Sequence, residues 1–271
     1  MRLLVHPGFH KTGTSSLQRG AMARADQLSP HLRLITRDQL TDCVAAARLF
    51  SLRARSKQRA RFADEFGQAL AALDPADPRP VLITAEDLCG WPPGRHDVPA
   101  YDAAPVLMMA AVARIDEMFG TAADITIWFT TRAPGSWQRS MYWQNLRATR
   151  LTDDFATYDA RWQRGAQLHQ IVGATAVALK GHARARVLST PLEDSCTHPL
   201  GHLKAALDLL DVPSDGLAPL PVENVQPDGA QEALLALNRS DLGDAELAVE
   251  KRALIKRLRL SGRMQRDPGT S

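Results

Sequence analysis

The sequence has little that would place it outside the ordinary class of globular proteins. It contains only three cysteines in 271 residues, Cys43, Cys89 and Cys196, and none of them forms a C-x-x-C pair. This scarcity argues against a disulfide framework or a structural zinc site, and it is typical of a reducing compartment. The longest apolar run, 106–113, is far shorter than the roughly 20 residues that a membrane-spanning helix needs.

The chain also lacks a strong excess of charge. Lys and Arg together number 33 and Asp and Glu 30, which gives a formal net charge of +3. Such a balance implies no nucleic-acid partner. The chain enters an apolar run at once, without the pattern of a signal peptide. We therefore expect a cytoplasmic protein with no stable insertion into a membrane.

Short runs of apolar and β-branched residues predict the strands of one sheet. The runs are 2–6, 32–36, 80–84, 124–130 and 186–190. Helical patterns separate them, and two of these are long: 38–73 is predicted to be mostly helical and 153–171 to be one helix. This alternation predicts an α/β fold, with a parallel sheet of about four or five strands flanked by helices. We expect a single domain over 1–271, with a basic C-terminal helix and short tail in 244–271.

The first eighteen residues contain a pattern that binds anions. Pro7 and Gly8 end the predicted strand 2–6, a segment K-T-G-T-S-S follows at 11–16, and a helical pattern begins directly after it. A strand, a glycine-bearing turn and a helix N-terminus together point backbone N–H groups inward. The positive end of the helix dipole then favours a phosphate or a similar group.

This segment differs from the loop of a P-loop kinase at one position. Gly8 and Gly13 have the G-x-x-x-x-G spacing, and Ser15 stands where that loop has its Ser or Thr. Thr14 holds the lysine position, and the only lysine nearby is Lys11, inside the loop. One lysine with a run of hydroxyls (Thr12, Thr14, Ser15, Ser16) suits an anionic group bound without a metal.

K-T-G-T-S-S-L-Q after an N-terminal strand resembles the 5′-phosphosulfate loop of the sulfotransferases. These enzymes use 3′-phosphoadenylyl sulfate (PAPS) as donor and release 3′-phosphoadenosine 5′-phosphate (PAP). The resemblance implies a P-loop NTPase-like sulfotransferase fold, with Lys11 stabilising charge on the leaving group. It implies that the donor is bound by Lys11, Thr12, Gly13, Thr14, Ser15 and Ser16. His10 could contact the ligand or only pack beneath the loop.

A second phosphate site is indicated at the end of the predicted strand 124–130. Arg132 leaves this strand, and Ser140 follows in a helical pattern. Both could converge on one phosphate, Arg132 as a bidentate donor and Ser140 as a neutral one. Their spacing resembles the 3′-phosphate site of the sulfotransferases. A surface ion pair is the other interpretation of Arg132.

Transfer to an acceptor hydroxyl also needs a general base within hydrogen-bond reach. Glu86 comes just after the strand 80–84, and ligands of open α/β sheets bind at the carboxyl ends of strands. Its position after I-T-A resembles the glutamate pattern of the carbohydrate-directed sulfotransferases. Glu86 is therefore the candidate base, and His96 in the next loop is the alternative. The resemblance implies a small-molecule, carbohydrate or glycolipid acceptor.

Two other functions stay open. A P-loop kinase would use Glu86 and Asp87 as a magnesium site, and a catalytically silent nucleotide-binding scaffold would use a basic face to bind a partner. The basic run 48–61 contains no acidic residue, and it predicts either a solvated helix face or an electropositive wall for an anionic ligand. His198 and His202 have a spacing that can bind a metal, but no third ligand follows, so no metal site is expected.

Overall fold

The fold is known from a computed structural model, which describes residues 1–221, 226–227 and 229–266. The chain forms two compact units, one of residues 1–137 and 164–220 and the other of 138–163 and 221–271. The expectation of a single domain over 1–271 stays a prediction. Residues 267–271 of the predicted tail lie outside the described part.

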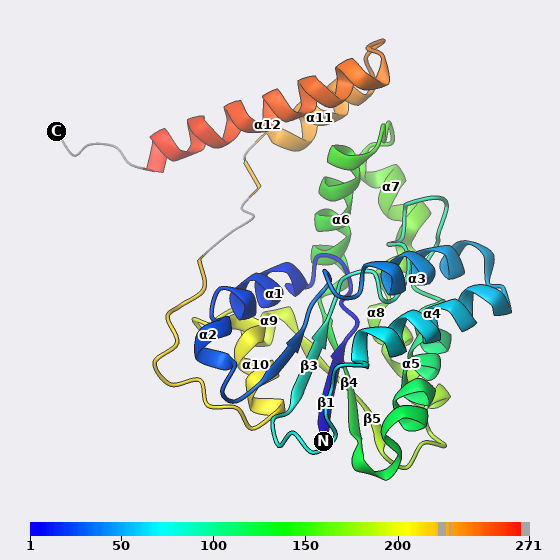
Figure 1. The fold of residues 1–271 in the computed structure, drawn as a ribbon. Helices are drawn as coiled ribbons and strands as arrows, with labels where there is room; N and C mark the ends of the chain where they lie inside the picture. Colours follow the sequence, from blue (N-terminus) through cyan, green and yellow to red (C-terminus); the bar gives the residue numbers. More distant parts are fainter. Residues whose placement is uncertain (222–225, 228, 267–271) are drawn as a thin grey trace. The chain divides into compact units, whose positions relative to one another are not determined.

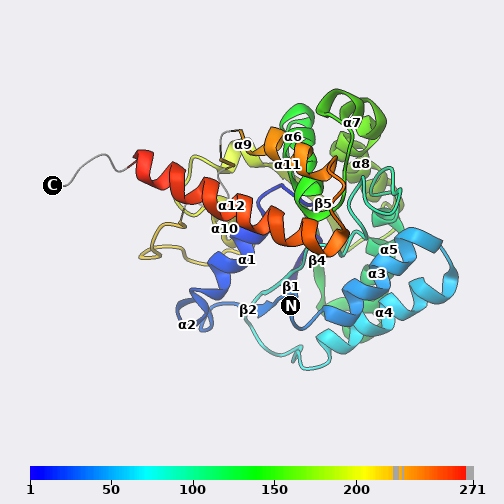
Figure 2. The same cartoon turned by 90° about the horizontal axis from the view of Figure 1, so that it is seen from above.

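The first unit is built on one parallel sheet of five strands. The strands are β1 (Arg2–His6), β2 (Arg33–Ile35), β3 (Val81–Thr84), β4 (Asp124–Thr131) and β5 (Ala185–Pro191). Their order is β2-β3-β1-β4-β5, so that β1 is central and Leu4 stands beside both Leu82 and Thr126. The predicted α/β fold with a parallel sheet is thus confirmed. Figure 2 looks down onto the carboxyl ends of these strands.

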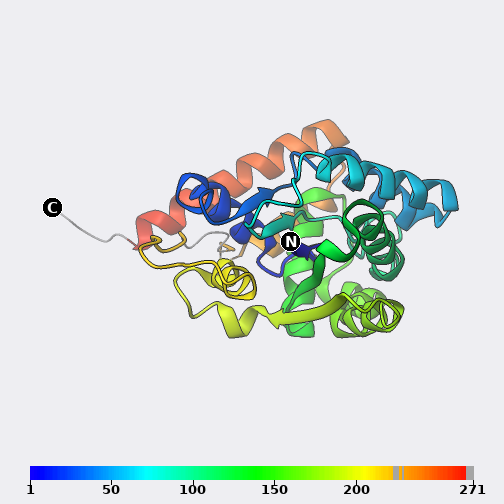
Figure 3. The same cartoon turned by 60° about the horizontal axis from the view of Figure 1, so that its bottom comes forward.

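Helices cover both faces of this sheet (Figures 1 and 3). They are α1 (Thr14–Met22), α2 (Ala25–Leu28), α3 (Thr41–Arg53), α4 (Ser56–Leu70), α5 (Ala104–Phe119), α8 (Leu168–Ala178), α9 (Leu192–Ser195) and α10 (Gly201–Leu209), with a 3-10 turn at Gly120–Ala122. Helices α1 and α10 pack on one face, where Leu17 and Leu203 meet Leu4 and Trp128 in a buried cluster. Helices α4, α5 and α8 lie on the other face.

The second unit is helical in the part that the structure describes. It contains α7 (Phe155–Trp162), α11 (Ala230–Asn238), α12 (Asp244–Arg266) and most of α6 (Pro134–Ala148). Tyr142, Tyr158 and Leu234 belong to its buried cluster. The ammonium group of Lys251 donates to the carbonyls of Leu146 and Thr149, and burial lowers its pKa. The lysine therefore fastens α12 to the end of α6.

The prediction of one helix over 153–171 was wrong. Helix α7 ends at Trp162, a 3-10 turn covers Gln163–Ala166, and α8 continues to Ala178. Gly165 lies in this 3-10 turn and packs against Pro93 so closely that a Cβ atom there would lie only 2.5 Å from Cβ of Pro93, so glycine is needed at this position. The long helical segment 38–73 is likewise divided into α3 and α4, at Ala54, whose φ of 47° is left-handed.

All three cysteines are free, with Cys43 and Cys89 buried and Cys196 exposed. In the described part of the chain, no helix is both long enough and apolar enough to cross a membrane. The cytoplasmic location stays a prediction.

The packing of α10 on α1 yields a direct test of the fold. Replacing the buried Leu203 with Ala should lower the free energy of unfolding by about 2–5 kcal/mol, because transfer and cavity terms add. The matched control is Leu52→Ala, since Leu52 is 42 % exposed and should change stability by no more than about 0.5 kcal/mol. Urea unfolding measures both, and equal effects would contradict this packing.

Candidate functional site

The loop that joins β1 to α1, residues 7–13, lies at the carboxyl end of the central strand. Gly8, Lys11 and Gly13 all have a left-handed backbone, with φ of 61°, 63° and 93°. A Cβ atom on Gly8 would lie 2.7 Å from Thr14, and one on Gly13 would lie 2.6 Å from the ring of His202. Glycine is therefore required at both positions by backbone angle and by close approach.

Helix α1 opens toward this loop without a side-chain cap. Its N-cap residue is Gly13, which has no side chain to cap the helix, and the first turn carries no acidic residue. The first backbone N–H groups of a helix have no carbonyl partner within the helix. Together with the helix dipole, they give the loop the chemistry of an anion site.

Two of the four predicted hydroxyl groups support the loop itself. Thr12 and Thr14 are buried, and both hydroxyls donate to the carbonyl of Phe9, at 2.8 and 3.1 Å. Thr14 stands where a kinase loop has its lysine, so that position is filled by an inward-facing side chain. Ser15 is exposed and Ser16 is partly exposed. Of the four predicted hydroxyls, two therefore bond the loop itself and two are accessible.

A buried chain of hydrogen bonds connects the loop to the sheet beneath it. Thr12 Oγ1 lies 2.8 Å from Thr130 Oγ1 on β4, which lies 3.1 Å from Nε2 of His6 on β1. Nδ1 of His6 lies 2.9 Å from Thr84 Oγ1 on β3. A carbonyl only accepts, so Thr12, which donates to Phe9, must accept from Thr130. His6 then carries its proton on Nε2 and accepts from Thr84 on Nδ1.

Trp128 lies between two buried histidines below the loop. Its ring centroid is 4.9 Å from that of His6 and 5.9 Å from that of His202. His202, on α10, has Nδ1 2.7 Å from Ser195 Oγ. Burial and, as the smaller cause, the neighbouring charge of His202 together lower the pKa of His6 to about 3. Burial also lowers the pKa of His202 to about 4, against opposing effects from the Thr12 backbone and Glu193.

Glu86 follows β3 and reaches the first turn of α1, directly after the loop. Its Oε1 accepts a hydrogen bond of 2.9 Å from the hydroxyl of Ser15. The candidate base and the loop, 71 residues apart in sequence, are therefore neighbours. Its neighbour Asp87 has a left-handed φ of 69° and is buried, so the chain turns sharply here and sends the two carboxylates in different directions.

Asp87 is the centre of a polar cluster. Its Oδ2 accepts a hydrogen bond of 2.6 Å from Arg48 and lies 3.9 Å from Arg37, while Oδ1 lies 3.1 Å from Nε2 of His10. Burial opposes ionisation of this carboxyl, but interactions with His10 and Arg48 together hold its pKa below the usual value. Nδ1 of His10 faces the hydroxyl of Tyr101 at 3.1 Å. Both ring nitrogens of His10 thus face protein groups, and contact of its side chain with a ligand stays a prediction.

His96 reaches the same cluster through an aromatic ring. It is exposed, with a left-handed φ of 50°, and its ring centroid lies 4.6 Å from that of Trp91. The guanidinium of Arg48 lies 4.3 Å from the same indole ring. Such a cation–π contact supports Arg48 in the orientation that pairs it with Asp87.

The residues predicted for a second phosphate lie in different units. Arg132, half-buried at the end of β4, donates from Nη1 to the carbonyl of Lys11 at 3.3 Å. Burial lowers the pKa of this guanidinium, and Glu193 opposes the shift. Glu193 also accepts a hydrogen bond from the backbone N–H of Ala133. Ser140 belongs to the second unit, so its convergence with Arg132 stays a prediction.

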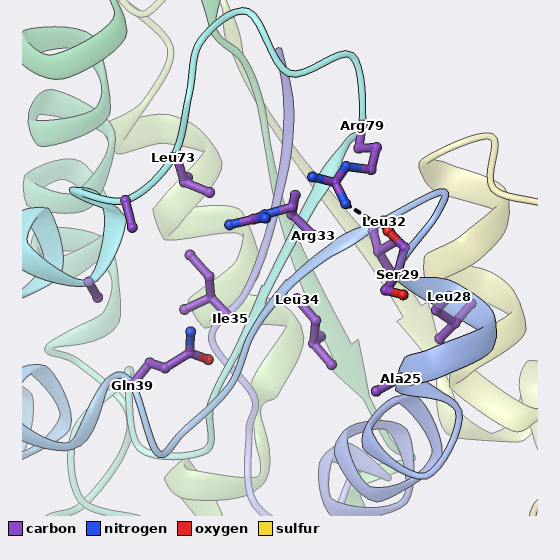
Figure 4. Close-up of a pocket in the computed structure, with 12 residues that line it drawn as sticks. Ala25, Leu28, Ser29, Leu32, Arg33, Leu34, Ile35, Gln39, Leu73 and Arg79 are labelled. Atoms are coloured by element: carbon purple, nitrogen blue, oxygen red, sulfur yellow. Dashed lines mark hydrogen bonds between the residues drawn. The ribbon is translucent and has the colours of Figure 1, made fainter.

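A cavity of about 260 Å³ lies elsewhere, beside β2 at the edge of the sheet (Figure 4). Arg33 and Ile35 extend to one side of this strand and Leu34 to the other. Arg79 donates to the carbonyl of Ser29 at 2.8 Å across the cavity. None of the residues predicted for the site lines it.

The sequence interpretation missed the groups below the loop. His6 had one available signal, as a polar residue at the end of an otherwise apolar strand. The sequence marks His202 only through its metal-binding spacing from His198, and it gives no local signal for Ser195 or Tyr101. Their partners lie far away along the chain, and no local spacing reveals them. Comparison with models of known protein families and with curated proteins found no match for this chain.

The two buried histidines predict how stability depends on pH. Their folded pKa values lie below the unfolded value of 6.5, so folding favours the neutral rings. Their contribution is complete above pH 6.5 and is lost as pH falls, by up to about 1.4 kcal/mol per pH unit for each ring. The loss levels off near the folded values of about 4 and about 3.

Urea unfolding of wild type and His202→Asn between about pH 7 and pH 5 measures this dependence. The variant should have the shallower loss of stability, because one of the two titrating rings is gone. Wild type and variant contain the same carboxylates, so the difference between their two slopes is the contribution of His202. Parallel slopes would contradict a buried neutral His202.

Proposed function

We propose that the protein transfers a sulfuryl group from PAPS to an acceptor hydroxyl. The observation that carries the proposal is the β1–α1 loop, whose lysine lies at position 11 while Thr14, at the kinase lysine position, is turned inward. Two left-handed glycines and an uncapped helix N-terminus complete an anion-binding geometry. We propose a carbohydrate or glycolipid as the acceptor.

In this proposal the loop holds the 5′-phosphosulfate of the donor. Backbone N–H groups at 13–15 would bind the phosphate, with the exposed hydroxyl of Ser15 and the partly exposed hydroxyl of Ser16 beside them; the N–H of Ser16 donates to the Gly13 carbonyl. The Lys11 side chain would donate to the bridging oxygen and stabilise the charge that develops as the sulfur–oxygen bond breaks. Sulfuryl transfer needs alignment and charge stabilisation more than covalent catalysis, and a braced loop supplies both. No metal is required in this scheme.

Arg132 would hold the 3′-phosphate, with Ser140 as its proposed second donor. Its guanidinium is half-buried and donates to the Lys11 carbonyl through one of its five N–H groups. A 3′-phosphate bound by Arg132 would lie beside the loop, so recognition of the 3′-phosphate and of the 5′-phosphosulfate would be linked. The pair would then select PAPS over ATP.

Glu86 is the proposed general base. Its contact with Ser15 places the carboxylate at the rim of the loop, where an acceptor hydroxyl would meet the sulfuryl group. His96 is the alternative base, and it lies on Trp91 in the neighbouring cluster.

One contact favours a kinase instead. A carboxylate after β3 that bonds the loop Ser15 is the arrangement in which P-loop enzymes hold magnesium. A P-loop kinase would have a lysine at position 14, but here that residue is a buried threonine. The kinase is therefore the second candidate function.

The proposal is tested by measuring transfer of a labelled sulfuryl group from PAPS to a panel of carbohydrate and glycolipid acceptors in the presence of EDTA. Wild type should label an acceptor, and Glu86→Gln should lower turnover by roughly 10²–10⁴-fold with little change in donor affinity. Glu117→Gln is the matched control, because Glu117 is exposed on α5, where it pairs with Arg114. Full turnover of Glu86→Gln would reject Glu86 as the base, and the turnover of His96→Ala would then test the alternative base. Phosphate transfer from ATP with magnesium, and none from PAPS, would establish the kinase.

A further inference from the structure

The turn between α3 and α4 gathers basic side chains in a short stretch. Helix α3 ends at Arg53 and α4 begins at Ser56, so the chain reverses direction within two residues. The five basic residues of this turn are Arg53, Arg55, Lys57, Arg59 and Arg61, and all are exposed. Figure 1 shows the turn at the outer end of both helices, away from the strands. We call residues 52–61 the basic turn.

The positive charge of the basic turn is not neutralised within the described part of the chain. No acidic residue occurs between Asp42 and Asp64. Arg61 pairs with Glu65 at 3.4 Å, but no ion pair with a described residue is found for the other four. Their net charge therefore faces solvent.

The local fold does not explain why these residues are basic. Lys57 and Arg59 stand in the first turn of α4, which has no acidic residue. Cations at a helix N-terminus are unfavourable, because they meet the positive end of the helix dipole. If this part of α4 were only solvated, acidic or neutral residues at these positions would stabilise the helix better.

An exposed apolar residue stands beside these charges. Leu52 is 42 % exposed on the last turn of α3, next to Arg53. The cations surround a convex turn of the chain and do not line a single helix face, since Lys57 and Arg59 point to opposite sides of α4. Mobile headgroups of a lipid layer can gather around such a turn, and an apolar side chain can enter the acyl boundary below them.

We propose that the basic turn docks reversibly on a membrane surface rich in anionic lipid headgroups. The contact is peripheral: the cations attract the headgroups, and Leu52 adds a shallow apolar anchor. Because the whole chain has a net charge of only +3, the attraction arises from this turn and not from the protein as a whole. The proposal does not depend on which group the enzyme transfers.

Co-flotation of the full chain with lipid vesicles tests it. The protein should bind vesicles of phosphatidylcholine mixed with phosphatidylglycerol, should not bind pure phosphatidylcholine, and should dissociate as salt is raised. Arg55→Gln with Lys57→Gln should weaken binding by roughly 25-fold, about fivefold for each cation removed. Leu52→Ser should weaken it severalfold with the same salt dependence. Unchanged circular dichroism would show that the variants are folded.

The matched control removes the same charge from α12 of the second unit, by Arg252→Gln with Lys256→Gln. It should change vesicle affinity by less than about twofold if the basic turn is the site. An equal loss in this control, binding to neutral vesicles, or no vesicle binding at all would overturn the proposal. So would binding of heparin or an RNA oligomer that depends on Arg55 and Lys57 when vesicles are not bound.

Discussion

A buried hydrogen bond of 2.8 Å between the hydroxyls of Thr12 and Thr130 connects the β1–α1 loop to the sheet, and the geometry of the site depends on it. Through Thr130 the loop is linked to His6, and through His6 to Thr84 on β3. Three neighbouring strands thus share one directed chain of donors and acceptors. Because this chain is buried, leaving any member unpaired would cost about 1–3 kcal/mol, so the loop has little freedom to relax.

This constraint gives a physical reason for the proposed chemistry. A loop that must bind a developing charge works best when its backbone is already oriented, so that no reorganisation is needed during reaction. Here the loop with left-handed angles at Gly8, Lys11 and Gly13 is braced by the threonine hydroxyls that donate to the Phe9 carbonyl, and Gly13 closely approaches the ring of His202. The carboxylate of Glu86 meets the same loop from β3. Asp87, one residue later, instead holds His10 and Arg48 in place.

Local patterns were enough to predict the strands and the loop, and pairings between distant residues were not. Apolar runs located all five strands, because a buried parallel strand has a strong local signature. The need for glycine at 165, in the turn that separates α7 from α8, comes from its contact with Pro93, 72 residues earlier, and no helical periodicity contains that contact. The inward turn of Thr12 and Thr14 was missed for a similar reason: a hydroxyl in a loop can face a ligand or the loop's own carbonyls, and only three-dimensional geometry decides between them.

Isothermal titration calorimetry with PAP in EDTA, followed by ATP with magnesium, measures which nucleotide the β1–α1 loop binds. We expect metal-free binding of PAP that is weakened roughly tenfold to hundredfold in Lys11→Gln and is unchanged in the surface control Lys180→Gln. ATP with magnesium should bind more weakly, because it has no 3′-phosphate for Arg132. Tight binding of ATP with magnesium, together with equal affinity for nucleotides with and without a 3′-phosphate, would show that the loop is not a PAPS site.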